Sequence, residues 1–243
     1  MSGEEWKRSQ QVGRSTRSHS RSVPSDQMGP PRMNLQTEPY LTQAARWPSS
    51  GRHILAQFDD QSVVVYQAYR PSIGDFAAEH GHFGGGFKLT RMSWIKPNFL
   101  WMMYRCGWAT KEGQEVVLAV RILRTALDTI LAQAVHSTFQ PTLYTDDEAW
   151  KKAVASSDVR LQFDPDHDPY GAPVERRAIQ LGLRGDVLVR YAKEWIVGIE
   201  DISAFVHEQH EHVIGRHLAE LWTPREDVYP VEDQAVRNRL GLS

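Results

Sequence analysis

The sequence contains little cysteine and no long hydrophobic run. Cys106 is the only cysteine among 243 residues, so a disulfide within the chain is excluded and a reducing compartment is favoured. No segment approaches the ~20 consecutive apolar residues of a membrane-spanning helix. The N-terminus lacks the apolar core of a secretory signal, and Glu4 and Glu5 are unusual in a transit peptide. We therefore expect a cytoplasmic or nuclear protein that does not enter a membrane.

A strong overall charge is also absent, because the formal net charge is −2. The charges are unevenly distributed, however. Up to Arg52 there are eight Lys/Arg and four Asp/Glu, whereas from His53 onward there are twenty and twenty-six. The basic character thus belongs to the N-terminal segment. This balance argues against broad binding of polyanions by the rest of the chain and leaves room only for a local patch.

Composition divides the chain into two parts. Residues 1–50 contain Arg/Ser repeats and the Gly29-Pro30-Pro31 turn but no apolar periodicity. Such a segment cannot offset its ordering entropy, so we expect a disordered basic tail, which can contact nucleic acid. Residues 51–243 are rich enough in apolar side chains to form a single globular domain. The sequence does not predict its oligomeric state.

Hydrophobic patterning predicts both strands and helices in this domain. After Pro71, the pair Ser72 and Asp75 predicts a capped helix that Gly81 ends. Because the order has no regular βαβ rhythm, we expect an α+β fold with a mixed or antiparallel sheet and flanking helices. The predicted strands are 54–58, 63–68, 116–122, 159–163, 179–183 and 195–202, and the other predicted helices are 98–105, 125–134, 146–156, 185–194 and one that begins at Ser203.

The segment 91–105 combines large apolar side chains with cations. Arg91, Lys96 and Arg105 are spaced through it, beside Trp94 and Trp101. Burying these charges without partners would cost several kcal/mol. The segment is therefore either a core helix whose basic ends reach solvent, or a wall of a cleft whose cations bind phosphate or carboxylate.

Three blocks of the sequence resemble one protein family. RMSWIKPNFLWMMYR, the upstream VYQAYRP and the downstream ERRAIQLGLRG occur in the order found in the uncharacterised family called domain of unknown function 4291. The resemblance covers roughly residues 53–221. It implies a shared fold and brings no established activity.

A second resemblance bears on mechanism. The run from Val64 to Pro71, followed by a helix and His80-Gly81, is similar to the opening of ADP-ribosyltransferase folds. This resemblance implies that Gln67 stands where those enzymes hold NAD with a His or Arg, and that Tyr69 and Arg70 help to orient the dinucleotide. Gln can hydrogen-bond a ribose hydroxyl but supplies no charge, so the chain departs from the pattern there.

The same resemblance implies a glutamate on a late strand that stabilises the developing cation of the transition state. Glu200 is the candidate by its order along the chain; the alternative is an ordinary charged residue before the next helix. In this hypothesis Arg91 and Arg105 bind phosphates, Lys96 adds a cation, and Trp94 or Trp101 stacks on a ring.

A proline-framed acidic loop offers a different chemistry. Asp164, Asp166 and Asp168 stand at alternate positions, as oxygen ligands of Mg²⁺ or Ca²⁺ can. The alternative is a rigid turn whose carboxylates pair with Arg176 and Arg177. These two arginines are also candidates for phosphate binding.

Histidines gather between His207 and His217. The spacing lacks the His-Glu-x-x-His pattern of metalloproteases, so we expect a polar helix surface there. Three functional hypotheses remain. The first is a nucleotide-binding enzyme, most concretely an ADP-ribosyltransferase-like transferase using NAD. The second is a non-catalytic module for nucleic acid or a phosphorylated ligand, and the third is a metal-dependent phosphoesterase.

Overall fold

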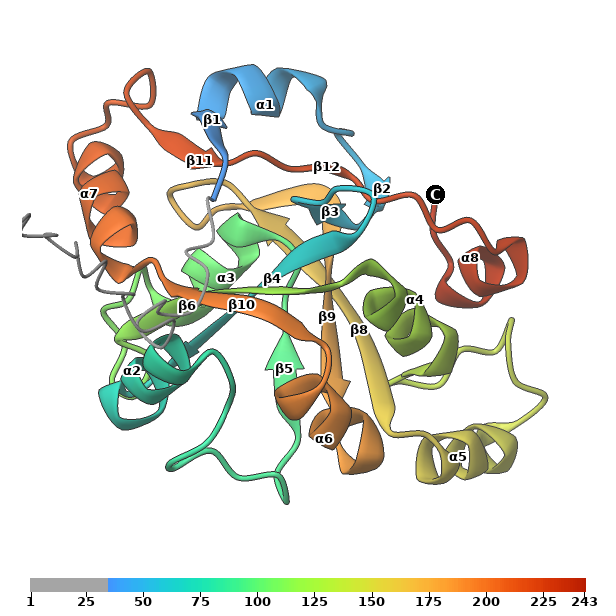
Figure 1. Cartoon of the computed structure of the whole chain (residues 1–243). Helices are drawn as coiled ribbons and strands as arrows, with labels where there is room; N and C mark the ends of the chain where they lie inside the picture. Colours follow the sequence, from blue (N-terminus) through green and yellow to red (C-terminus); the bar gives the residue numbers. More distant parts are fainter. Residues whose placement is uncertain (1–34) are drawn as a thin grey trace, which may run out of the picture.

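The computed structural model describes residues 35–243, and these residues form a mixed α+β structure with eight helices (Figure 1). The helices are α1 (Tyr40–Arg46), α2 (Pro71–His80), α3 (Phe99–Cys106), α4 (Arg124–Gln133), α5 (Asp147–Ser156), α6 (Gly185–Lys193), α7 (Ser203–Ile214) and α8 (Gln234–Leu240). The strands are β1 (Thr37–Pro39), β2 (Gly51–Arg52), β3 (Leu55–Ala56), β4 (Ser62–Tyr69), β5 (Ser93–Ile95), β6 (Val116–Leu123), β7 (Ala134–His136), β8 (Val159–His167), β9 (Pro173–Leu183), β10 (Ile196–Asp201), β11 (Trp222–Pro224) and β12 (Asp227–Val228).

Two larger sheets carry the fold. The first has the order β10-β6-β4 and is antiparallel. The second has the order β2-β9-β8-β7, with β5 also paired to β9; the β2–β9 and β7–β8 pairs are parallel and the others antiparallel. A bridge between Tyr66 and Lys96 joins the first sheet to the chain that follows β5. The mixed sheet expected from the sequence is therefore confirmed.

The main core lies between the two sheets. The sheet β10-β6-β4 is buried on both faces, which explains the continuous apolar runs of β4 and β6. One face meets the alternating apolar residues of β8 and β9, together with α4 and α6. The other face packs on α3 and α7. In the second sheet only one face is apolar, in agreement with the alternation of β8 and β9.

Local signals predicted several helix ends correctly. Asn98 caps α3 by accepting a hydrogen bond from the Trp101 N–H at 2.7 Å, and Asp146 caps α5 in the same way. Gly81 ends α2 in a left-handed conformation that suits glycine. The capping pair predicted at Ser72 and Asp75 is wrong, because α2 begins at Pro71 without a side-chain cap.

The expected boundary at Ser50 is too late. Residues 35–50 include β1 and α1, and β1 pairs with β11 near the other end of the chain (Figure 1). The Gln43 amide, fully buried, donates to Thr223 Oγ1 at 2.8 Å, and Trp47 is 8% exposed. Contacts with residues 180 positions away therefore order this segment. Residues 1–34 of the expected tail lie outside the described residues.

Candidate functional site

A pocket of about 410 Å³ opens where β4 ends and α2 begins. Tyr69 and Arg70 reach it from the end of β4, and Ile73 comes from the first turn of α2. The loop between α2 and β5 forms most of the remaining wall. Its lining residues are Gly86, Phe87, Lys88, Arg91 and Met92, followed by Ser93 in β5.

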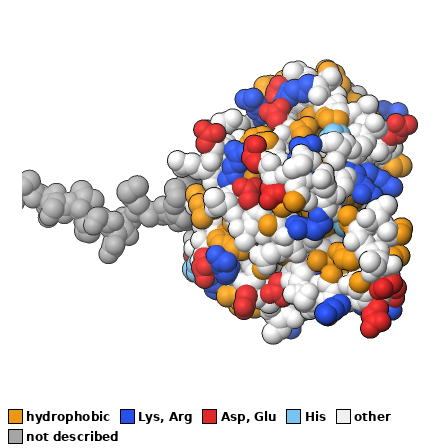
Figure 2. All heavy atoms as spheres, turned by 90° about the vertical axis from the view of Figure 1, so that its right-hand side faces the viewer, with side chains coloured by type: hydrophobic (Ala, Val, Ile, Leu, Met, Phe, Trp, Pro, Cys, Tyr) orange, Lys and Arg blue, Asp and Glu red, His pale blue; other side chains and the backbone are white. Residues whose placement is uncertain are grey.

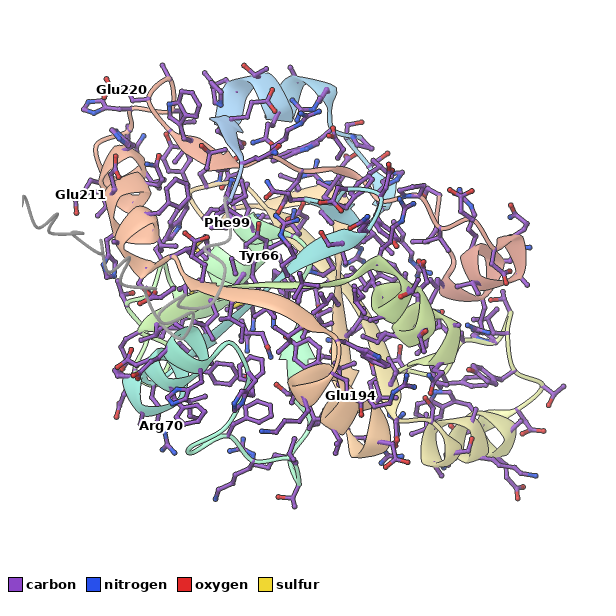
Figure 3. The ribbon with its side chains drawn as sticks, in the orientation of Figure 1. Tyr66, Arg70, Phe99, Glu194, Glu211 and Glu220 are labelled. Carbon is purple, nitrogen blue, oxygen red and sulfur yellow. The ribbon has the colours of Figure 1, made fainter. Side chains whose placement is uncertain are left out.

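Among residues 35–243, three cations line this pocket and no carboxylate does. Arg70, Lys88 and Arg91 are all exposed, and none of them forms an ion pair within residues 35–243. Arg70 lies at the periphery of the molecule, whereas Tyr66, four residues earlier on β4, lies in the interior (Figure 3). The first turn of α2 adds the positive end of a helix dipole. The pocket is therefore electrostatically suited to an anion.

The polar floor of the pocket is held by a buried amide. Gln67 is 2% exposed, and its Nε2 donates to Tyr69 Oη and to Ser93 Oγ, each at 2.8 Å. Its Oε1 accepts from Tyr191 Oη at 2.6 Å. Nε2 also lies 3.2 Å from the Trp94 carbonyl, which can only accept, and this contact fixes which end of the amide faces the two hydroxyls.

The two hydroxyls at this floor leave one hydrogen to spare. Tyr69 Oη and Ser93 Oγ are 2.7 Å apart, so one of them donates to the other. Both lie within hydrogen-bond distance of Gln67 Nε2, which cannot accept a hydrogen, so the second hydroxyl hydrogen can point to a ligand. Burial raises the pKa of Tyr69 and of Tyr191, so both remain protonated at neutral pH.

Glu200 is not part of this arrangement. The register places it opposite Ala119, which is opposite Tyr66, so Glu200 and Tyr66 share a face of the sheet. Because side chains alternate along a strand, Gln67 and Tyr69 point to the other face. The structure thus brings Gln67, Tyr69, Arg70 and Arg91 together and separates Glu200 from them.

Lys96 and Arg105, the other two cations of the segment 91–105, lie outside the pocket. Lys96 is 5% exposed, and its ammonium forms no ion pair in the described part of the chain. Burial, reinforced by Arg105, lowers the pKa of Lys96 to about 8. Arg105 is exposed in the last turn of α3. Neither residue lines the pocket.

The two tryptophans expected to stack on a ring are engaged within the protein. Trp101 is 4% exposed, and its ring stacks with Tyr104 and His167 at centroid distances of 5.4 and 5.3 Å. Trp94 lies over Gly182, where an added Cβ would come within 3.0 Å of the indole. Trp94 follows Ser93 on β5 and so points to the other face of that strand.

The acidic loop does not form an oxygen-ligand cage. Asp164 accepts from the amides of Gln162 and Gln180, at 2.9 and 2.8 Å. Asp168 accepts two backbone N–H groups in its own turn. Within residues 35–243, these carboxylates do not belong to any group of three ligands close enough to share a metal ion. Asp164 and Asp166 lie on β8 rather than in a loop, and only Asp168 belongs to the turn that follows.

Arg176 and Arg177 have different roles. Arg176 is 8% exposed, its Nη2 lies 2.6 Å from Asp166 Oδ2, and its Nη1 donates to the Pro48 carbonyl at 2.8 Å. Its guanidinium also lies over Trp47. Arg176 thus ties β9 to the segment before β2, as a structural residue. Arg177 is exposed and does not line the pocket.

Pattern reasoning missed several residues of the pocket. Arg91 was among the expected phosphate-binding residues, but Lys88 was not, although it stands two positions after the Gly84-Gly85-Gly86 run and three before Arg91. Ser93, Phe87 and Ile73 carry no such signal, because only the tertiary fold brings them beside Tyr69.

The fold and the pocket define an α+β protein with a cationic site at the end of one strand. The sequence model of the family described as "Domain of unknown function (DUF4291)" matches residues 53–229. The chain therefore belongs to this family, as its three sequence blocks indicated. No curated protein gave a match. None of the helices in residues 35–243 is both long and apolar enough to cross a membrane.

Proposed function

We propose that the protein binds a small phosphate-bearing molecule in the pocket between β4, α2 and the loop before β5. The observation that carries this proposal is the set of three unpaired cations, Arg70, Lys88 and Arg91, around one concavity without a carboxylate. Charge-assisted hydrogen bonds from guanidinium and ammonium groups are the usual means of holding phosphate.

The remaining lining supports a ligand larger than a free anion. The pocket volume lies within the roughly 300–1,000 Å³ typical of small-molecule sites. Phe87 and Ile73 offer apolar surface beside the cations, and the Tyr69–Ser93 pair offers a hydroxyl donor. A phosphate joined to a sugar or a ring, as in a nucleotide, satisfies all three kinds of surface.

NAD is the member of this ligand class to which the sequence resemblance pointed. An NAD-dependent transferase is accordingly the more specific form of the proposal. In this form Gln67 positions the hydroxyls of Tyr69 and Ser93 and does not itself bind the phosphates of the dinucleotide. Because no acid lines the pocket, group transfer would need a carboxylate from the substrate or from outside this lining.

A broad nucleic-acid surface is less well supported. On the face that carries α4, α5 and α8, basic and acidic side chains are interspersed (Figure 2). Binding to a polyanion depends on many phosphate contacts and is strongly weakened by salt. A module for nucleic acid remains a proposal that rests on the basic N-terminal segment, of which residues 1–34 are outside the described residues.

Calorimetric titration with pyrophosphate, ADP-ribose, NAD and ATP tests the proposal. We expect at least one of these to bind, and the double variant Arg70→Ala/Arg91→Ala to bind it at least tenfold more weakly, with an unchanged melting temperature because both side chains are exposed. Arg177→Ala is the matched control and should bind normally. Absence of binding by all four compounds, or equal binding by the double variant, would contradict the proposal. Incubation with NAD and analysis of released nicotinamide tests the transferase form separately.

A further inference from the structure

A second group of chemically active side chains lies at the end of α7. His212 is in the last turn of this helix, and His217 and Glu220 follow in the segment before β11. One ligand atom from each of the three lies within 4.8 Å of those of the other two. Glu220 and Arg70 are far apart in Figure 3, so this group is separate from the cationic pocket.

Backbone hydrogen bonds hold the three residues in this arrangement. After Gly215, the chain folds back so that the His217 N–H donates to the His212 carbonyl at 2.8 Å. The Glu220 N–H then donates to the His217 carbonyl at 2.9 Å. The Trp222 N–H donates to Gln209 Oε1 at 2.7 Å and anchors the end of the segment to α7. The backbone that carries the three side chains is therefore held by the fold before any ion arrives.

We propose that His212, His217 and Glu220 bind one divalent transition-metal ion, with zinc as the best fit. Two imidazole nitrogens and one carboxylate oxygen are the donor types that Zn²⁺ takes in proteins, and a water molecule can complete a tetrahedral set. The carbonyl end of α7 also favours a positive charge at this place. With three protein ligands and a fourth position open to water, such a metal site would be accessible from solvent.

A simple ion pair does not account for the whole group. His212 Nδ1 lies 3.5 Å from Glu220 Oε2, which is suitable for a contact between protonated His212 and the carboxylate. His217 has no role in that pair, yet it is held within reach of both.

The other histidines of α7 differ from this trio. The His210 ring stacks on Trp108, with a centroid distance of 5.4 Å and an interplanar angle of 2°. His207 belongs to the same helix but to no ligand group in the described part of the chain. His80 and His82 lie near each other at the end of α2, with ring centroids 6.1 Å apart. They provide a matched histidine pair without the carboxylate.

Cobalt(II) titration of the full chain, followed by visible absorption and competition with zinc, tests the proposal. We expect one saturable site with ligand-field bands that zinc abolishes. His212→Ala and His217→Ala should each weaken binding at least tenfold, and Glu220→Gln should do so to a smaller extent. His207→Ala and the double variant His80→Ala/His82→Ala should bind as the unchanged protein does.

The apo variants should keep the circular dichroism and melting temperature of the unchanged chain, because the three side chains lie at the surface or only half-buried. Absence of saturable cobalt binding, or equal binding after removal of both His212 and His217, would overturn the proposal. Loss of binding in the His80/His82 variant instead would transfer the site to α2 and overturn it equally.

Discussion

The carboxylate of Glu226 is the N-terminal anchor of α3. Its Oε1 accepts a hydrogen bond from the backbone N–H of Phe99, the first residue of the helix, at 2.7 Å. Its Oε2 accepts from Asn98 Nδ2 at 3.1 Å. Glu226 is 1% exposed and 127 positions from Phe99, so a distant part of the chain fixes the start of the helix that carries the family's WMMYR block. Tyr66 and Phe99 lie side by side in the interior, with ring centroids 5.5 Å apart (Figure 3).

Replacing Glu226 should test both its hydrogen bond to the Phe99 N–H and the raised pKa of its carboxyl group. Glu226→Ala leaves the Phe99 N–H buried without an acceptor, and we expect a loss of about 1–3 kcal/mol in unfolding free energy. Burial raises the pKa of Glu226 well above its ordinary value of 4.5, although the Phe99 N–H opposes this. Above pH 4.5 the folded state therefore binds more protons than the unfolded state, and stability declines as the pH rises.

Glu226→Gln has no such titration. The stability of the unchanged protein relative to Glu226→Gln should fall between pH 5 and pH 8 in urea unfolding experiments. Parallel stability curves for the two proteins would show that the folded state does not raise this pKa.

Lys96 should be a destabilising residue. Its pKa falls from 10.5 to about 8, mainly through burial. Below pH 8 the folded state carries the full cost of the buried charge, and this cost disappears as the pH rises from 8 to 10.5. Lys96→Met should stabilise the protein at pH 7 by an amount on the order of 1–3 kcal/mol, with a smaller gain at pH 10. Lys152→Met, at an exposed position of α5, is the control. A loss of stability in Lys96→Met at pH 7 would indicate that the ammonium has a stabilising partner.

The buried pair Asp166–Arg176 should be strongly coupled. Each partner leaves a buried charge when the other is removed, a change that typically costs about 3–5 kcal/mol. Asp166→Asn and Arg176→Met should therefore each be strongly destabilising in chemical unfolding, and the double variant should lose much less than the sum of the two. Strict additivity would mean that the 2.6 Å contact carries no coupling energy.

Local sequence signals predicted much of the fold but not the neighbours of each element. The helix expected from residue 98, after Lys96-Pro97, matches the start of α3, and Gly81 indicated the end of α2, because helix ends depend on residues adjacent in the chain. The alternation in β8 and β9 correctly indicated a sheet with one buried face. By contrast, nothing near Gln43 reveals that its partners are Thr223 and Pro224, so residues 35–50 resembled part of the tail.

The same limit applies to the candidate site. Gln67, Tyr69 and Arg70 were named together as candidates because they lie in one short motif, and all three lie at or beside the pocket. Glu200 was chosen from its order along the chain, and strand order does not specify the face to which a side chain points. A shift of one residue in the strand register would move the Glu200 side chain to the other face of the sheet. The observed pairing with Ala119 places Glu200 on the face opposite Gln67.

The hydroxyl pair at the pocket floor provides the most direct test of how the ligand is held. If the spare hydrogen of Tyr69 or Ser93 donates to a phosphate oxygen, then either hydroxyl can supply it after the other is removed. Tyr69→Phe and Ser93→Ala should each weaken binding of the ligand identified by titration only about two- to fivefold. This loss of affinity is smaller than the loss expected when a hydrogen bond to a charged group is removed. The double variant should lose at least tenfold more than the product of the single effects. Arg177→Ala again serves as the control. If the two single losses simply multiply, the hydroxyls act independently, and the shared hydrogen is not what contacts the ligand.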